Sequence, residues 1–301
     1  MGSIALSSSG LDDNALTSRR LALPRKEPAM GLRLFDHPLS PYSQKIKIAL
    51  REKGIAFEPC LPTGLGSGAQ ADDLLAANPR GEVPALVLED GEGLFESTII
   101  LEYIEERWPT PPLAPETPLA RARARMIEDA MDTHYEAINW ALGEIHHFGR
   151  GDGPLRDQLL AGAEADLKHW YGWLEHQLGA DPWFGGGAFG WADAAVLPHL
   201  LGSEAFGLGP DPDSPLGAYL TRGRLRPSVV AGREEIAALG TGGASLEAVR
   251  AALEAGLFKR EYRDHRLEWM LRHGGLAVVQ EGLARGNIRF TEPFSHPGAS
   301  P

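Results

Sequence analysis

Hydrophobic and polar positions follow two different periods between residues 32 and 108. Residues 32–35 form a short apolar run, which predicts a strand. Residues 41–53 have a helical period and place their apolar side chains on one face: Tyr42, Ile46, Ala49 and Leu50. Gly54 then ends this helix, because glycine readily adopts the left-handed conformation that follows a last helical turn. The regular part of the chain therefore begins with a strand and a helix.

The same patterns predict the elements that follow. We expect a strand over 55–60, a helix over 70–77, strands over 84–88 and 93–95, and a helix over 97–107. An Asp90-Gly91 pair between the last two strands is a strong hairpin signal. The last helix is expected to turn four apolar side chains inward: Ile99, Ile100, Tyr103 and Ile104. The resulting order, βαβαββα, predicts a small mixed sheet with helices on both faces.

After residue 108 the strand signals end. Residues 109–118 contain five prolines in ten residues, which indicates a stiff linker. The remaining pattern predicts helices over 119–147, 154–179, 191–202, 216–238 and 245–286. We therefore expect an α/β domain over 31–108, this linker, and an all-α domain over 119–301. Residues 1–30 are rich in serine and small residues without a sustained period, so they are predicted to be a disordered tail.

Composition and charge exclude several kinds of protein. The formal net charge of −12 argues against nucleic-acid binding, which needs a basic face. No apolar stretch approaches the roughly 20 residues that span a bilayer, so no membrane helix is expected. Cys60 is the only cysteine, so the chain has no internal disulfide or cysteine-based zinc site and suits a reducing, cytoplasmic compartment. The adjacent His146 and His147 diverge on a helix, and we expect no metal site.

The chemistry begins at Ser40, where the first strand ends and the first helix opens. Ser40 stands at the helix cap and Pro41 at the first helical position, where a missing N–H costs nothing. The unpaired N–H groups and the dipole of a helix start attract anions, and the serine hydroxyl adds one more donor. Ser40 is also explained by capping alone. Ser43, three residues later, is the alternative hydroxyl.

Four motifs together resemble those of the glutathione transferase family. They are Ser40–Lys45 at the first helix, Asn78–Leu86, Phe95–Thr98 leading into Tyr103, and Trp183–Gly186 continuing to Trp191-Ala192-Asp193. They occur in the family's order and cover roughly residues 31–235. The resemblance implies a thioredoxin-like N-terminal domain, a helical C-terminal domain and a homodimer.

The resemblance also assigns roles to individual residues. Ser40 holds the sulfur of glutathione as a thiolate. Val83 and Pro84 form a cis peptide bond that turns the backbone of Val83 outward, to pair with the cysteinyl unit like a short antiparallel strand. Ser97 accepts the γ-glutamyl carboxylate and Glu96 pairs with the γ-glutamyl amine. Capping alone also explains Ser97, and a strand-opening role also explains Pro84.

Two positions depart from the family pattern. Glu82 stands where relatives often carry lysine or glutamine near the glycyl carboxylate, a contact for which Arg80 is a candidate substitute. Gly190 stands where serine or threonine usually caps the buried helix of the second domain. Residues 240–301 exceed the usual family length, and we expect them to lie near the mouth of the substrate pocket.

The sequence thus predicts a glutathione transferase that acts in detoxification. A thiolate stabilised by Ser40 attacks a small hydrophobic electrophile and expels a halide or an ether oxygen. Two alternatives remain open at this point. One is an isomerase that uses glutathione as a recycled cofactor, and the other is a non-catalytic binding protein that reuses the fold.

Overall fold

A four-stranded mixed sheet forms the centre of the N-terminal part of the chain. We describe a computed structural model, covering residues 31–66, 72–242 and 246–290. The strands lie in the order β2-β1-β3-β4, with bounds β1 (Leu32–Phe35), β2 (Phe57–Cys60), β3 (Ala85–Val87) and β4 (Gly93–Phe95). β1 pairs in parallel with β2 and antiparallel with β3, and β3 pairs antiparallel with β4. The tail predicted over 1–30 lies outside the described residues.

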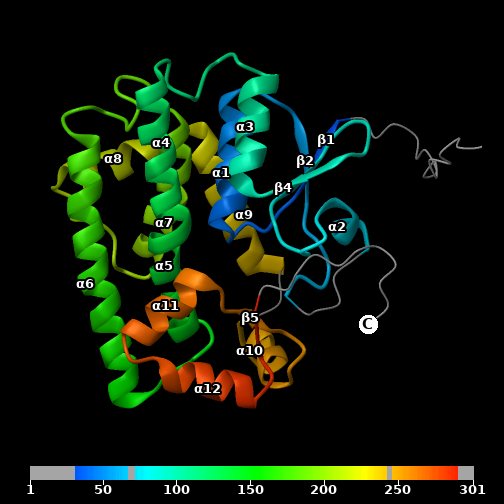
Figure 1. The fold of residues 1–301 in the computed structure, drawn as a ribbon, viewed down its shortest axis with the longest axis vertical. Coiled ribbons are helices and arrows are strands. Elements are labelled where there is room, and N and C mark those ends of the chain that lie inside the picture. The colour runs from blue at the N-terminus through cyan, green and yellow to red at the C-terminus, as the bar shows by residue number, and fades with distance from the viewer. Residues whose placement is uncertain (1–30, 67–71, 243–245, 291–301) are drawn as a thin grey trace, which may run out of the picture.

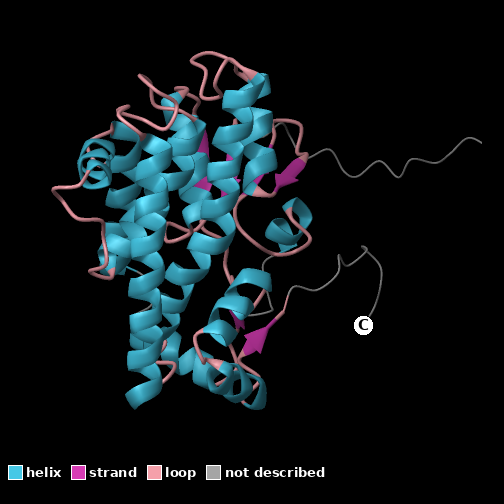
Figure 2. Ribbon diagram, turned by 60° about the vertical axis from the view of Figure 1, so that its left-hand side comes forward, coloured by secondary structure: helices cyan, strands magenta, loops and turns pink. Residues whose placement is uncertain are grey.

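Helices cover both faces of this sheet (Figures 1 and 2). They are α1 (Pro41–Glu52), α2 (Asp72–Ala77) and α3 (Ser97–Arg107). Because side chains alternate along a strand, Leu34 of β1 joins the main core with α1 and α3, whereas Phe35 packs with Leu74 of α2 in a separate cluster. The predicted order βαβαββα and the thioredoxin-like arrangement are confirmed.

One detail of α3 differs from the prediction. Ile100 and Ile104 are fully buried and Tyr103 is half-buried, but Ile99 is 53% exposed. Neighbouring positions on a helix point about 100° apart, so a stripe centred on Ile100 and Ile104 leaves Ile99 at the surface. The expectation that Ile99 turns inward was wrong.

The chain continues as a bundle of helices. Their bounds are α4 (Pro118–Ala130), the π-helical turn η1 (Met131–Tyr135), α5 (Glu136–His146), α6 (Gly153–Leu178), α7 (Trp191–Ala205), α8 (Pro215–Gly223) and α9 (Pro227–Gly242). The helix predicted over 119–147 is one helical path that contains the π turn. Residues 216–238, where helices are predicted, lie in two of them, because α8 ends at Gly223 and Pro227 opens a new first turn.

The C-terminal segment, residues 246–290, adds three helices and a minimal sheet. Its elements are α10 (Leu246–Glu254), β5 (Arg260–Glu261), α11 (Asp264–Arg272), α12 (Leu276–Ala284) and β6 (Ile288–Arg289). β5 and β6 pair in parallel, so the expectation of helices alone in this region was wrong. Two-residue strands are too short to leave an alternating pattern in the sequence. In Figure 1 the segment runs from yellow-orange to red across the lower end of the molecule.

Helix α1 is enclosed between the sheet and the helical bundle. Lys45 is 1% exposed, and its ammonium lies 2.6 Å from Glu128 Oε1 of α4 and also contacts Asp132 of η1. Lys47, equally buried, pairs with Asp36 and lies 2.6 Å from Glu235 Oε2 of α9. These ion pairs fix the direction of α1, and hence the place of Ser40, relative to the helical part.

No helix among residues 31–66, 72–242 and 246–290 combines the length and the apolar character that crossing a bilayer requires.

Gly190 precedes α7 at a point where the backbone of residue 113 comes very close. The Trp191 N–H donates to the Leu113 carbonyl at 2.8 Å, and a Cβ on Gly190 would lie 2.7 Å from that carbonyl oxygen. The Asp193 carboxylate accepts the N–H groups of Gly190 at 2.8 Å and Phe184 at 3.1 Å. Glycine stands here instead of serine or threonine because the Leu113 carbonyl leaves no room for a Cβ, and Asp193 provides the capping interaction.

We predict that Gly190→Ala lowers the free energy of unfolding by about 1–3 kcal/mol, because the added methyl group displaces a backbone carbonyl. Urea unfolding of the purified variants measures this. Gly187→Ala is the matched control, since a Cβ there meets nothing within 4 Å. Equal stability of the two variants would contradict the account.

Candidate functional site

Ser40 caps α1 and keeps one donor free for a ligand. Its backbone is extended (φ −79°, ψ 117°), and its Oγ accepts the N–H of Ser43 at 3.2 Å. Accepting that bond fixes the position of the oxygen but leaves the hydroxyl hydrogen available. Ser40 is partly exposed, so this hydrogen can point to a bound anion at the helix start.

Ser43 has a different environment. Its side chain is fully buried, and its Oγ has no hydrogen-bond partner among the described residues. Of the two hydroxyl groups, only that of Ser40 is exposed to solvent and accessible to a ligand. The geometry therefore favours Ser40 over the alternative that the sequence left open.

Val83 and Pro84 lie immediately before β3, and the peptide bond between them is cis, as the resemblance implies. The ladders that join β3 to β1 and to β4 both start at Ala85. Val83 is half-buried and lies outside these ladders. Its backbone is thus placed where an extended ligand could pair with it.

Glu96 and Ser97 begin α3. Ser97 is buried, and Glu96 at the cap has φ 68°, the only positive φ of a non-glycine residue in the described ranges. Such a conformation in a side-chain-bearing residue costs energy and is common at functional sites. The Glu96 carboxylate forms an ion pair with Arg80, so Arg80 faces Glu96.

The sheet register brings these residues to one place. Ala85 of β3 lies opposite Phe35, the last residue of β1, and opposite Phe95, the last residue of β4. Ser40 follows β1, Val83-Pro84 precedes β3, and Glu96-Ser97 follows β4. All of the predicted site residues therefore gather at the same end of the sheet.

Glu82 meets charged residues of the C-terminal segment. Its carboxylate lies 3.8 Å from Arg263 Nη1 and 3.9 Å from Arg289 Nη2. Burial, together with the hydrogen bond and the charge shared with Glu261, raises the pKa of Glu82 to about 7. Burial alone would raise the pKa of Glu261 as well, but the bond to Glu82 and the nearby arginines lower it to about 2. The two carboxyl groups therefore share a proton near neutral pH.

Tyr42 connects the start of α1 with the same cluster. Its hydroxyl donates to the Asp132 carbonyl at 2.7 Å and accepts from Arg263 Nη2 at 3.4 Å. The Arg263 guanidinium also lies over the Tyr42 ring, 5.7 Å from its centre. Burial raises the pKa of Tyr42, so the phenol stays neutral. Arg263 thus contacts Tyr42, two residues after Ser40, and Glu82, the residue before Val83. The sequence analysis missed both contacts.

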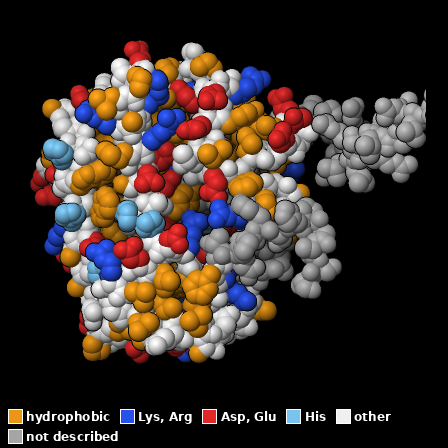
Figure 3. Space-filling view, viewed as in Figure 1, with side chains coloured by type: hydrophobic (Ala, Val, Ile, Leu, Met, Phe, Trp, Pro, Cys, Tyr) orange, Lys and Arg blue, Asp and Glu red, His pale blue; other side chains and the backbone are white. Residues whose placement is uncertain are grey.

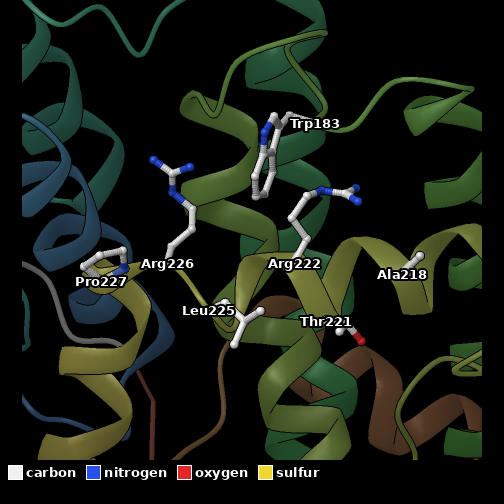
Figure 4. Close-up of a pocket in the computed structure, with 7 residues that line it drawn as sticks. All are labelled: Trp183, Ala218, Thr221, Arg222, Leu225, Arg226 and Pro227. Atoms are coloured by element: carbon white, nitrogen blue, oxygen red, sulfur yellow. The ribbon is translucent and has the colours of Figure 1, made fainter.

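Two pockets lie away from Ser40. The first, about 550 Å³, is lined by Trp183, Ala218, Thr221, Arg222, Leu225, Arg226 and Pro227. Figure 4 shows its Trp183 between the side chains of Arg222 and Arg226, which lie 5.2 and 5.3 Å from the ring centre. The second, about 180 Å³, is enclosed between η1, α5, α6 and α11 and includes His134, His169 and His265. Neither is lined by the predicted site residues.

Comparisons with known proteins agree with this geometry. The family model described as glutathione S-transferase, N-terminal domain, matches residues 34–112. A maleylacetoacetate isomerase of Pseudomonas aeruginosa is 32% identical over 189 residues, which is 60% of this chain and 85% of that protein. A stringent starvation protein A homolog of Haemophilus influenzae is 32% identical over 205 residues, 65% of this chain and 86% of the other.

The chain belongs to the glutathione S-transferase family. Its fold is similar to the solved structure of rice GST1 in complex with glutathione, with a TM-score of 0.57 and 28% identity. That match covers 97% of the rice chain but 70% of this one. Much of the present chain is therefore additional to the shared fold.

We predict that ionisation of Glu82 lowers stability as the pH rises. Its pKa is about 7 in the folded protein and near 4.5 when exposed, so the folded state holds the extra proton between these values. From about pH 6 to about pH 8 the free energy of unfolding should fall by about 1.4 kcal/mol more than in Glu82→Gln, where this ionisation is absent.

Urea unfolding at several pH values measures the effect. The groups that face Glu82 are Glu261, Arg263, Arg289 and Arg80, and they are unchanged in the variant. Glu92→Gln, the same chemical change at an exposed site, should keep the slope of the parent protein. A parent and Glu82→Gln with parallel profiles would rule out this role of Glu82.

Proposed function

We propose that this protein is a glutathione transferase in which Ser40 stabilises the glutathione thiolate. The observation that carries the proposal is the partly exposed Ser40 hydroxyl at the start of α1. Its oxygen accepts the Ser43 N–H, and its hydrogen has no acceptor among the residues that the structure describes. The thiolate attacks an electrophilic carbon of a small hydrophobic substrate. A halide or an ether oxygen leaves with the bonding electrons.

The required stabilisation is within reach of this geometry. A free thiol titrates near pH 8.5, and lowering its pKa by about two units needs roughly 2.7 kcal/mol in favour of the thiolate. A hydrogen bond to a charged group contributes about 1.5–3 kcal/mol, and a helix start adds about 0.3–1 kcal/mol. One hydroxyl donor and one helix start are therefore sufficient to lower the thiol pKa by about two units.

Glutathione itself is proposed to lie along the end of the sheet. The backbone of Val83, turned outward before Pro84, pairs with the cysteinyl unit. Ser97 at the start of α3 receives the γ-glutamyl carboxylate and Glu96 the γ-glutamyl amine. In this proposal residues 31–108 bind glutathione, and the helical residues 119–301 bind the electrophile.

The setting of the reaction is also a proposal. We infer a cytoplasmic homodimer that acts in detoxification without a metal cofactor. Ile99 of α3 and Met126 of α4 expose apolar surface that a second subunit could cover. Arg125 and Glu102 hold these two helices together at 2.7 Å.

Two relatives support alternative functions. The similarity to a maleylacetoacetate isomerase favours a reaction in which glutathione adds to a double bond and leaves again, so that it is not consumed. The name of the stringent starvation protein A homolog states no reaction, so that similarity is compatible with the non-catalytic binding protein. Retention on immobilised glutathione would support either of the first two functions. Product analysis then separates them, because only conjugation consumes the thiol.

We predict that Ser40→Ala raises the thiol pKa of bound glutathione by about one to two units, because the thiolate loses its hydroxyl donor. Thiolate absorbance of the complex, followed over a pH titration, measures this value. Ser43→Ala is the matched control and should leave the pKa unchanged. An unchanged pKa in Ser40→Ala would show that Ser40 is only a helix cap, and a larger shift in Ser43→Ala would reassign the donor.

A further inference from the structure

The C-terminal segment is a fixed part of the helical bundle. Glu144 of α5 is fully buried; Tyr262 Oη donates to its carboxylate at 2.9 Å, and Arg150 and Arg260 form ion pairs with it. Arg266 of α11 makes a two-point contact with Glu136 at 2.6 and 3.0 Å. Because burying an unpaired charge is costly, these contacts hold β5 and α11 firmly on α5.

From this base the segment reaches the N-terminal part of the chain. The Lys259 N–H donates to the Gly66 carbonyl at 2.9 Å. Arg263 contacts Tyr42 and Glu82, and Arg289 contacts Glu82. Figure 3 shows basic and acidic side chains side by side in the middle of this face of the molecule. The segment therefore forms a wall beside the end of the sheet that carries Ser40 and Val83.

The two guanidinium groups on this wall are only partly engaged: Arg289 Nη2 donates to Glu261 Oε2 and Arg263 Nη2 donates to Tyr42 Oη, each at a long 3.4 Å. Their distances of 3.8 and 3.9 Å to Glu82 exceed the length of a hydrogen bond. Arg289 Nε is buried and has no hydrogen-bond partner in the described ranges. A buried donor without a partner is uncommon and costs free energy. Arginine binds carboxylates through a planar two-point fork, so a carboxylate is the ligand that fits this pair.

The direction of strand pairing indicates which carboxylate arrives there. In an antiparallel pair, the residue that follows on one strand lies opposite the residue that precedes on the other. If the cysteinyl unit of glutathione pairs with Val83, its glycyl residue lies opposite Glu82, the residue before Val83. The glycyl carboxylate then enters the space between Glu82 and the two arginines.

We propose that Arg263 and Arg289 bind the glycyl carboxylate of glutathione, so that the C-terminal segment completes the glutathione site; this inference rests on the proposed function. Glu82 balances the charge of the arginines while the site is empty. Its raised pKa near 7 lets it become neutral when the second carboxylate arrives. Arg80, whose guanidinium pairs with Glu96, is not part of this proposal.

The test compares two ligands on the full chain by titration calorimetry: glutathione and its glycyl monoethyl ester, in which a neutral ethyl ester replaces this carboxylate. The parent protein should bind glutathione at least about tenfold more tightly than the ester, as expected for hydrogen bonds to a charged group. This comparison needs no variant. Equal binding of the two ligands would overturn the carboxylate site and leave the proposed function standing, whereas no binding of either would contradict both.

Variants then assign the contact to its residues. Arg263→Met and Arg289→Met should each reduce the preference for glutathione over the ester to within about threefold. Arg285→Met is the charge-matched control, because Arg285 lies on the exposed end of α12 in an ion pair with Glu281 at 2.5 Å, and it should keep the full preference. A full preference in both Arg263→Met and Arg289→Met would place the carboxylate elsewhere and overturn the proposal.

Discussion

The ion pair between Lys45 of α1 and Glu128 of α4 is the contact on which the geometry of the site depends. Both side chains are 1% exposed, so neither charge can be satisfied by water. Glu128 also accepts from Thr98 Oγ1 at 2.9 Å and from Trp191 Nε1 at 2.5 Å, and the same carboxylate therefore joins α1, α3, α4 and α7. A buried pair persists only when its remaining hydrogen-bonding capacity is filled in this way. It sets the direction of α1 and so the place of Ser40 at the start of that helix.

Local signals in the sequence predicted most of the N-terminal part and singled out Ser40, whereas the family resemblance supplied the other candidate site residues. A strand end, a hydroxyl cap and a proline at the first helical position are neighbours in the chain, so Ser40 could be found without the fold. The structure adds that Ser43 is enclosed and that Val83, Glu96 and Ser40 meet at one end of the sheet through the register of β1, β3 and β4. Register depends on pairing between distant segments, and the pattern of a single strand specifies only its two faces.

The sequence could not reveal the contacts that depend on long separations. Lys45 lies 83 residues from Glu128, and Arg263 lies 221 residues from Tyr42. A helical pattern identifies the apolar face of α1. It does not identify the carboxylates that neutralise the charge of a buried lysine on the other side of this helix. The C-terminal segment shows the same limit, because its two-residue strands have no period and its charged residues resemble those of a solvated helix. Its position against Glu82 becomes visible only in three dimensions.

Binding of glutathione as a thiolate at Ser40 is the central claim, and proton release measures it most directly. Calorimetric titration at about pH 7 in buffers of different ionisation enthalpy counts the protons released, and S-methylglutathione, which has no thiol proton, provides the baseline for all other groups. A thiol pKa lowered by about two units predicts the release of roughly 0.7 proton per glutathione beyond this baseline. Binding of glutathione with no release beyond that of S-methylglutathione would contradict the account.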